Sequence, residues 1–122
     1  AYATAEEFAR EGCDLVICSR DAVALNAARS RLESLGAHVT AIVADLATTD
    51  GLHHVIEGTK ARHGHVDILV CNTGGPPTGA PMAHEWDAWQ QASDLLLKTV
   101  VELTRAFVPG MQTRGWGRVV AI

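Results

Sequence analysis

The segment from Val66 to Pro77 constrains the fold more than any other part of the chain. It contains the continuous apolar run Ile68–Val70 and ends in small and turn-forming residues, Asn72 to Pro77. A continuous apolar run predicts a strand that is buried on both faces, as in parallel sheets covered by helices on either side. Ligands of such sheets bind beyond the carboxyl ends of the strands. We therefore expect the loop from Asn72 to Gly75 to contact a ligand.

The rest of the sequence alternates helical and strand patterns. Apolar residues at helical spacing predict helices, and short apolar runs predict strands between them. Each connection is long enough for a right-handed crossover between parallel strands, which predicts an α/β protein with helices layered on a parallel sheet. The expected helices span residues 1–12, 21–36 and 48–64, and an amphipathic segment from His84 is followed by a fourth, long helix that runs to about Val108. The expected strands span residues 15–18, 39–44, 66–71 and 118–122.

Glycine and polar residues mark the expected helix ends. Asp21 suits the N-cap of the second helix, and Thr48 or Thr49 suits that of the third. Glycines are expected to end the first three helices, at Gly12, Gly36 and Gly64. The expected inward positions are Leu25, Ala28, Leu32 and Leu35 in the second helix, and Leu52, Val55, Ile56 and Thr59 in the third.

The fourth expected helix is apolar on two sides. Pro109-Gly110 is expected to end or kink this helix, and Gly115-Trp116-Gly117 to form a turn. One side faces the sheet, and the other is covered either by the same domain or by a second subunit; both interpretations stay open. The two apolar stripes are Leu96, Thr99, Val100, Leu103 and Phe107, and Leu97, Val101, Thr104 and Val108.

Length and charge limit the possible partners. A chain of 122 residues, 48% of them hydrophobic, can bury one core, so one domain is expected. Ten basic and 14 acidic residues give a formal net charge of −4 without a basic block, so neither nucleic acid nor a membrane surface is an expected partner. No apolar run approaches the ~20 residues of a membrane helix. A small molecule or another subunit is the expected partner.

Cysteine and histidine positions predict neither a disulfide framework nor a metal site. Cys13, Cys18 and Cys71 are odd in number and lack paired C-x-x-C spacing, which favours a cytoplasmic protein. The His54-to-Glu57 spacing occurs in helical ligand sets. No complete ligand pattern appears among the histidines, however, and the polar faces of surface helices collect such residues. The remaining members of this group are His53, His63 and His65.

Four groups of residues, in chain order, resemble the short-chain dehydrogenase/reductase family. They are Cys18-Ser19-Arg20, Asp45-Leu46, Asp67 to Gly74, and Leu103 to Pro109 followed by Gly117 to Val120. Their joint order and spacing cover essentially the whole chain, which looks close to the 3-oxoacyl-carrier-protein-reductase type of this family. It implies a three-layer, doubly wound Rossmann-type parallel sheet, in which residues 1–122 form part of a dinucleotide-binding domain.

The resemblance implies that the first strand ends bind the adenosine part of a cofactor. Asp45, followed by Leu46, resembles the family aspartate that accepts a hydrogen bond from the adenine amino group; the alternative is an aspartate that only ends a strand. Ser19 stands where NAD-preferring relatives usually carry an acid, and Arg20 follows it. A hydroxyl and a guanidinium suit a 2′-phosphate, so NADP is expected rather than NAD. The alternative for Arg20 is a solvated side chain.

Asn72, Thr73 and Gly74 resemble the last three residues of the family's Asn-Asn-Ala-Gly motif. The resemblance implies that the asparagine steadies the sheet and that the small residues let the backbone approach the cofactor ribose. Cys71 replaces the first asparagine and is interpreted as a packing residue, not a nucleophile. Leu96 replaces an asparagine that supports a water relay in many members. Leucine cannot form hydrogen bonds, so the proton path is expected to differ, or the activity to be weak or altered.

Several parts of the family pattern are expected outside this chain. The phosphate-cradling glycine loop would precede Ala1, and the Tyr-x-x-x-Lys pair would follow Ile122. Tyr2 has Glu6 where that pair has lysine, so no catalytic residue is assigned within the chain. The family's first strand is also missing, which would leave two strand edges open. We therefore expect an incomplete slice of a longer enzyme that is poorly stable and inactive by itself.

The reaction implied by the resemblance is hydride exchange between NADPH and a carbonyl, 3-oxoacyl-like, or the matching alcohol. The expected partners are that small-molecule substrate and a second copy of the protein, bound through the helix Leu95 to Val108. A phospho-acceptor receiver domain is one alternative, because Asp45 stands at a strand end, but its other acidic and lysine residues are not visible. A non-catalytic nucleotide-binding or interaction module is the other, and Leu96 agrees with it.

Overall fold

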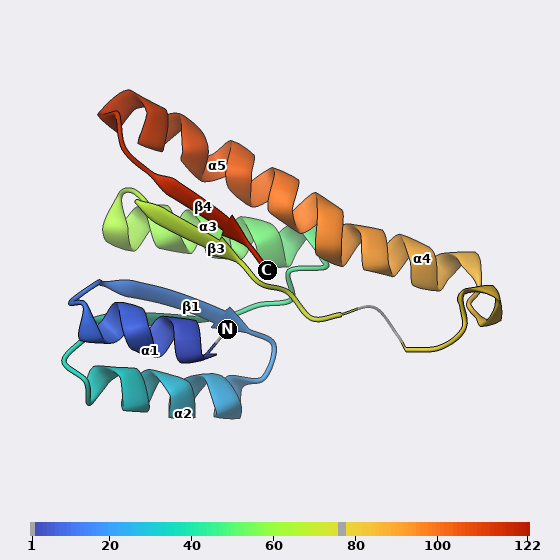
Figure 1. The fold of residues 1–122 in the computed structure, drawn as a ribbon, viewed down its shortest axis with the longest axis horizontal. Helices are drawn as coiled ribbons and strands as arrows, with labels where there is room; N and C mark the ends of the chain where they lie inside the picture. Colours follow the sequence, from blue (N-terminus) through green and yellow to red (C-terminus); the bar gives the residue numbers. More distant parts are fainter. Residues whose placement is uncertain (1, 76–77) are drawn as a thin grey trace. The chain divides into compact units, whose positions relative to one another are not determined.

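The structure, a computed structural model, describes residues 2–75 and 78–122. The chain divides into two compact units, residues 1–45 and 46–122 (Figure 1). Each unit contains one pair of parallel strands, which agrees with the predicted α/β class. Ala1 and the Pro76-Pro77 part of the predicted ligand loop lie outside the described residues.

The first unit is built in the order helix, strand, helix, strand. The two helices contact each other, and both contact the first strand. The strands are in register from Leu15 opposite Val39 to Ser19 opposite Val43, so their carboxyl ends emerge together. The elements are α1 (Tyr2–Arg10), β1 (Leu15–Ser19), α2 (Ala22–Glu33) and β2 (Val39–Val43). The core of this unit consists of Ala9, Leu15, Leu32, Ala37 and Val39.

The N-terminal boundary of α2 follows the predicted signal, whereas the helix ends at Glu33, before the predicted stop at Gly36. Asp21 is the N-cap, and its carboxylate accepts the N–H groups of Val23 at 2.9 Å and Ala24 at 3.0 Å. The inward position predicted for Leu35 is wrong, because α2 ends at Glu33 and Leu35 is 39% exposed.

The second unit contains the longer helices. Its elements are α3 (Thr49–His63), β3 (Ile68–Cys71), a 3-10 turn (Pro81–Ala83), α4 (Trp86–Ser93), a π-helical segment (Asp94–Lys98), α5 (Thr99–Arg114) and β4 (Arg118–Ala121). Helices α3 and α5 contact each other, and α5 contacts β3. Thr48 is the N-cap of α3, and its hydroxyl accepts the Gly51 N–H at 3.0 Å. The core consists of Leu52, Ile56, Leu69, Cys71, Leu103, Phe107 and Met111.

In the described residues, strand β3 is fully buried on one face only. Leu69 and Cys71 are buried, whereas Ile68 and Val70 are half-buried, so burial on both faces is not reached. Its partner β4 has four exposed residues. The ligand loop predicted from Asn72 onward starts directly after β3.

The long helix does not end at Pro109-Gly110, so the helix end predicted there is wrong, whereas the alternative of a kink stays a prediction. Helix α5 continues to Arg114, and Gly115 caps it with a left-handed φ of 72°. Phe107 and Met111, one turn apart, are both buried in the core. Packing of these residues holds the helix together across Pro109, although proline removes one backbone hydrogen bond.

A π-helical segment at residues 94–98 changes the predicted stripes. The Thr99 N–H donates to the carbonyl of Asp94, five residues back instead of four. From Thr99 onward the first stripe is buried at Thr99, Leu103 and Phe107, but Leu96 is 42% exposed. The extra residue in the turn rotates Leu96 away from the core face.

Candidate functional site

The carboxyl ends of β1 and β2 bring three predicted site residues together. Ser19 ends β1, and Arg20 and Asp45 follow the two strands. The Arg20 Nη1 atom lies 4.0 Å from Asp45 Oδ2, and both side chains are more than a third exposed. An exposed pair at this distance contributes little stability. The pair places a positive and a negative charge side by side at the ends of β1 and β2.

A second carboxylate in the turn after β1, that of Asp21, points to the backbone of α2. Both hydrogen bonds to the Asp21 carboxylate come from the first turn of α2, where a negative charge is favourable. The Asp21 N–H donates to the Ser19 hydroxyl at 3.3 Å. Asp21 therefore caps the helix, and the other polar side chains of the turn are the Ser19 hydroxyl and the Arg20 guanidinium.

The thiols of Cys18 and Cys71 are poor nucleophiles. Burial raises the pKa of the Cys18 thiol; a backbone hydrogen bond at Ala44 lowers it in part, and the Asp45 carboxylate raises it. Burial also raises the pKa of Cys71, which lies in the core of the second unit. A raised thiol pKa reduces the thiolate fraction, so the geometry supports the packing role predicted for Cys71.

The remaining predicted site residues belong to the second unit. Leu46 is its first residue, and Asn72, Thr73 and Gly74 follow β3. Asn72 and Thr73 are half-buried, and Gly74 is exposed. A Cβ on Gly74 would meet Leu95 Cδ2 at 3.9 Å, an ordinary contact, so packing within the unit does not require glycine there. The joint arrangement of these residues with Ser19, Arg20 and Asp45 stays a prediction.

Thr99 is a residue whose role the sequence did not indicate. Its side chain is 0% exposed. The hydroxyl lies 2.9 Å from the carbonyl of Leu46 and 3.1 Å from that of Asp94. The sequence placed Thr99 in a buried stripe, and a hydroxyl among apolar side chains was the available signal that it has a polar partner.

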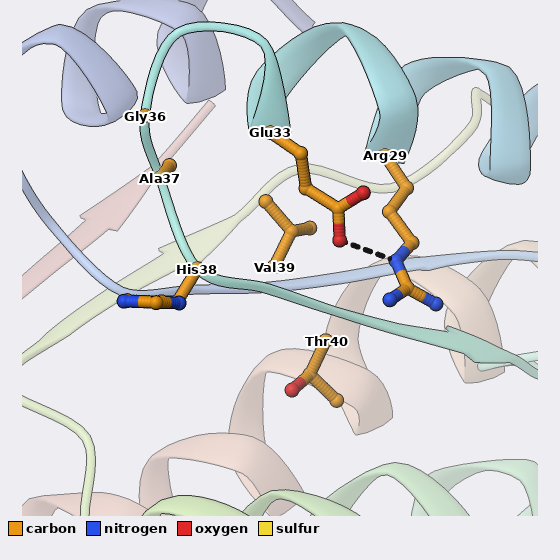
Figure 2. Close-up of a pocket in the computed structure, with 7 residues that line it drawn as sticks. All are labelled: Arg29, Glu33, Gly36, Ala37, His38, Val39 and Thr40. Atoms are coloured by element: carbon orange, nitrogen blue, oxygen red, sulfur yellow. Dashed lines mark hydrogen bonds and ion pairs between the residues drawn. The ribbon is translucent and has the colours of Figure 1, made fainter.

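A surface hollow of about 460 Å³ lies elsewhere on the first unit (Figure 2). Figure 2 shows it bordered by the ion pair between Arg29 and Glu33, 2.7 Å apart, and by His38 and Thr40. These residues lie at the C-terminal part of α2 and the beginning of β2. The hollow is therefore at the opposite end of β2 from Asp45 and is not part of the candidate site.

The described residues contain no group of three or more His, Cys, Asp or Glu side chains arranged to bind a metal ion. In the predicted histidine group, Glu57 pairs with Lys60 at 3.5 Å, and His65 lies 3.3 Å from Asp67. No helix within the described ranges has the length and apolar character needed to cross a bilayer.

Comparison with known proteins identifies the family. The family model described as short chain dehydrogenase matches residues 1–122. The chain therefore belongs to the short-chain dehydrogenase family, as its motifs predicted, and its parallel strand pairs are part of the Rossmann-type fold of that family.

Individual relatives are 27–34% identical to this chain over the aligned residues. Dehydrogenase/reductase SDR family member 4 of Homo sapiens is 30% identical over 122 residues, which are 99% of this chain and 44% of that protein. L-Sorbose reductase from Gluconobacter frateurii, complexed with NADPH and L-sorbose, is 34% identical with a TM-score of 0.90, over 99% of this chain and 47% of that chain. A metagenomic short-chain oxidoreductase in complex with NADP is 27% identical with a TM-score of 0.91, over 98% and 55%. The chain thus spans about half the length of these relatives.

Proposed function

We propose that the full-length protein containing this chain is an NADP(H)-dependent oxidoreductase, and that this chain supplies the adenosine half of its cofactor site. The family membership supports the class of reaction. The bound cofactor would supply or accept a hydride, exchanged with a carbonyl or the matching alcohol. The observation that carries the proposal is the pairing of Arg20 with Asp45 at the adjacent ends of β1 and β2.

The donor set of the first unit fits an adenosine 2′-phosphate. The Arg20 guanidinium and the Ser19 hydroxyl would bind the phosphate, and the Asp45 carboxylate would accept the adenine amino group. The capping role of Asp21 supports this fit, because its negative charge is directed toward the α2 backbone. The NADPH and NADP complexes of the two related structures agree with it. Leu46, Asn72, Thr73 and Gly74 would contact the cofactor from the second unit.

The test of this proposal is cofactor preference in the full-length protein. We expect Arg20→Gln to weaken NADPH binding about tenfold or more, as for the loss of a charged hydrogen-bonding partner, and to leave NADH binding within about twofold. Arg29→Gln is the matched control, because Arg29 is another exposed arginine of the first unit but lies on α2, paired with Glu33. Equal binding of NADPH by wild type and Arg20→Gln, measured by isothermal titration calorimetry, would contradict the proposal.

We also propose a class of substrate, a homo-oligomer and a cellular location for the full-length protein. A small-molecule carbonyl, 3-oxoacyl-like, is the substrate class suggested by the resemblance. A homo-oligomer through residues 95–108 is supported by Leu97 and Val101, which are 63% and 42% exposed on the outward stripe. A cytoplasmic location agrees with the free thiols of the three cysteines. Light scattering of the full-length protein with Leu97→Glu, expected to dissociate, tests the interface.

A second candidate function is a non-catalytic nucleotide-binding module. The observation that favours it is Leu96, an exposed apolar side chain where many family members carry a hydrogen-bonding asparagine. The two functions differ in turnover. Oxidation of NADPH by the full-length protein with carbonyl substrates, including 3-oxoacyl thioesters, supports the enzyme, whereas tight binding without oxidation supports the module.

A further inference from the structure

Thr99 and Thr59 are the buried polar side chains of the described residues, and their hydroxyls have different partners. The Thr59 hydroxyl donates to the Val55 carbonyl of its own helix at 2.7 Å. The Thr99 hydroxyl instead reaches the Leu46 carbonyl, 53 positions away in sequence, at 2.9 Å. Thr99 therefore connects α5 to the segment that follows β2, whereas Thr59 makes only a local bond.

The π-helical segment places Thr99 for this connection. The Asp94 carbonyl, 3.1 Å from the Thr99 hydroxyl, already accepts the Thr99 N–H. The hydroxyl has a single hydrogen, and we assign its donation to the nearer acceptor, the Leu46 carbonyl. The Asp94 carbonyl keeps the Thr99 N–H as its donor. Inserted π turns are frequent next to functional positions.

The preceding residue supports the same segment at its other end. The Lys98 ammonium donates to the hydroxyl of Thr49, the first residue of α3, at 3.1 Å. Consecutive residues of the long helix thus bind both ends of the short connection from Leu46 to Thr49. Leu46 directly follows Asp45, whose side chain lies 4.0 Å from Arg20.

From this geometry we infer that Thr99 is a positioning residue for the adenosine end of the cofactor. It acts through the Leu46 carbonyl, which fixes the backbone next to Asp45. The inference rests on the proposed function, since it assumes that Asp45 and Leu46 bind adenosine. Loss of the hydroxyl would remove this link between α5 and the Leu46 backbone, and misplacement of a binding group by about 1 Å is enough to weaken its interactions strongly.

The experiment uses the full-length protein and adenosine 2′,5′-bisphosphate as the probe. Thr99→Val removes the hydroxyl at nearly constant volume, Thr99→Ser retains it, and Thr59→Val is the matched control for a buried hydroxyl with a local partner. We expect Thr99→Val to raise the Kd about fivefold or more, and the other two to stay within about twofold of wild type, whatever the change in melting temperature. Lys98→Met, at a less buried position, is expected to raise the Kd about fourfold, which is above the range of the controls.

Three results would separate the hypotheses. Wild type that does not bind the bisphosphate refutes the proposed function and, with it, this inference. Wild type that binds, with Thr99→Val equally tight, refutes the inference alone. An equal loss in Thr99→Val and Thr59→Val also refutes it, because general destabilisation then explains the effect. If Thr99→Val does not fold, the Kd of Lys98→Met decides: weakened binding supports the inference, and unchanged binding contradicts it.

Discussion

Gly117 lies directly against Met111. A Cβ at position 117 would be 2.5 Å from the Cβ, Cγ and Sδ atoms of Met111, which is 4% exposed in the core of the second unit. The turn between α5 and β4 therefore passes so close to the last turn of the helix that only glycine fits without rearrangement.

We expect Gly117→Ala to destabilise the protein by about 1–3 kcal/mol, the usual cost of overpacking. Gly75→Ala is the matched control, because a Cβ there would meet nothing within 4 Å. Urea unfolding of the full-length protein, followed by circular dichroism, measures both. Equal midpoints for the two variants would show that Met111 moves aside at no cost.

Asp21→Ala is expected to reduce stability by about 1 kcal/mol, because the N–H groups of Val23 and Ala24 lose their acceptor. Asp21→Ser retains an oxygen at the N-cap and is expected to recover most of the loss. Asp14→Ala, an exposed aspartate outside the helices, is the control. Thermal unfolding of the three variants tests the cap, and a loss in Asp14→Ala as large as in Asp21→Ala would contradict it.

Ser19→Asp is expected to change the cofactor preference. The new carboxylate would repel a 2′-phosphate and accept the hydroxyls of an unphosphorylated ribose, so NADPH binding should weaken about tenfold and NADH binding should improve. Ser30→Asp, which places the same charge on the exposed surface of α2, serves as the control. Fluorescence titration with both cofactors measures the preference, and an unchanged NADPH-to-NADH ratio in Ser19→Asp would refute the assignment.

The buried thiols predict a loss of stability in alkaline solution. The pKa values of Cys18 and Cys71 are raised above the ordinary value of 9.0, so the folded state favours the neutral thiols. Their contribution is complete below pH 9 and is lost as the pH rises through the raised pKa values, because the unfolded chain releases its protons first. The double variant Cys18→Ala/Cys71→Ala is expected to lose less unfolding free energy between pH 8 and about pH 10.5. Parallel curves for wild type and variant would contradict this prediction.

Local signals in the sequence predicted most element boundaries. Asp21 and Thr48 cap their helices, and Gly12 and Gly64 follow the ends of theirs with positive φ angles. These features depend on a few neighbouring residues, so turn chemistry alone identifies them.

Features that depend on packing were not predicted. Periodicity cannot reveal a π turn, and the stripe drawn through Leu96 assumed a regular helix. Pro109 looked like a helix end because its cost is local, whereas the burial of Met111 that offsets this cost is tertiary.

The sequence predicted the strand-end residues of the candidate site but not the hydrogen bond that Thr99 makes beside it. Ser19, Arg20 and Asp45 follow in-register strands, and the strand pattern was sufficient to expect the proximity of Arg20 and Asp45. The hydrogen bond between Thr99 and Leu46 joins positions 53 apart in sequence, and no motif specifies it.

The π-helical segment also means that this chain can lose a residue there at low cost. Removing Leu97 would restore regular α-helical winding and leave the core contacts of Leu103 and Phe107 in register. The compensating rotation, about 100°, would fall on α4, which has no buried residue among those described. Shortening the long helix by one position at residues 94–98 is therefore a smaller perturbation than shortening it anywhere within Thr99–Arg114.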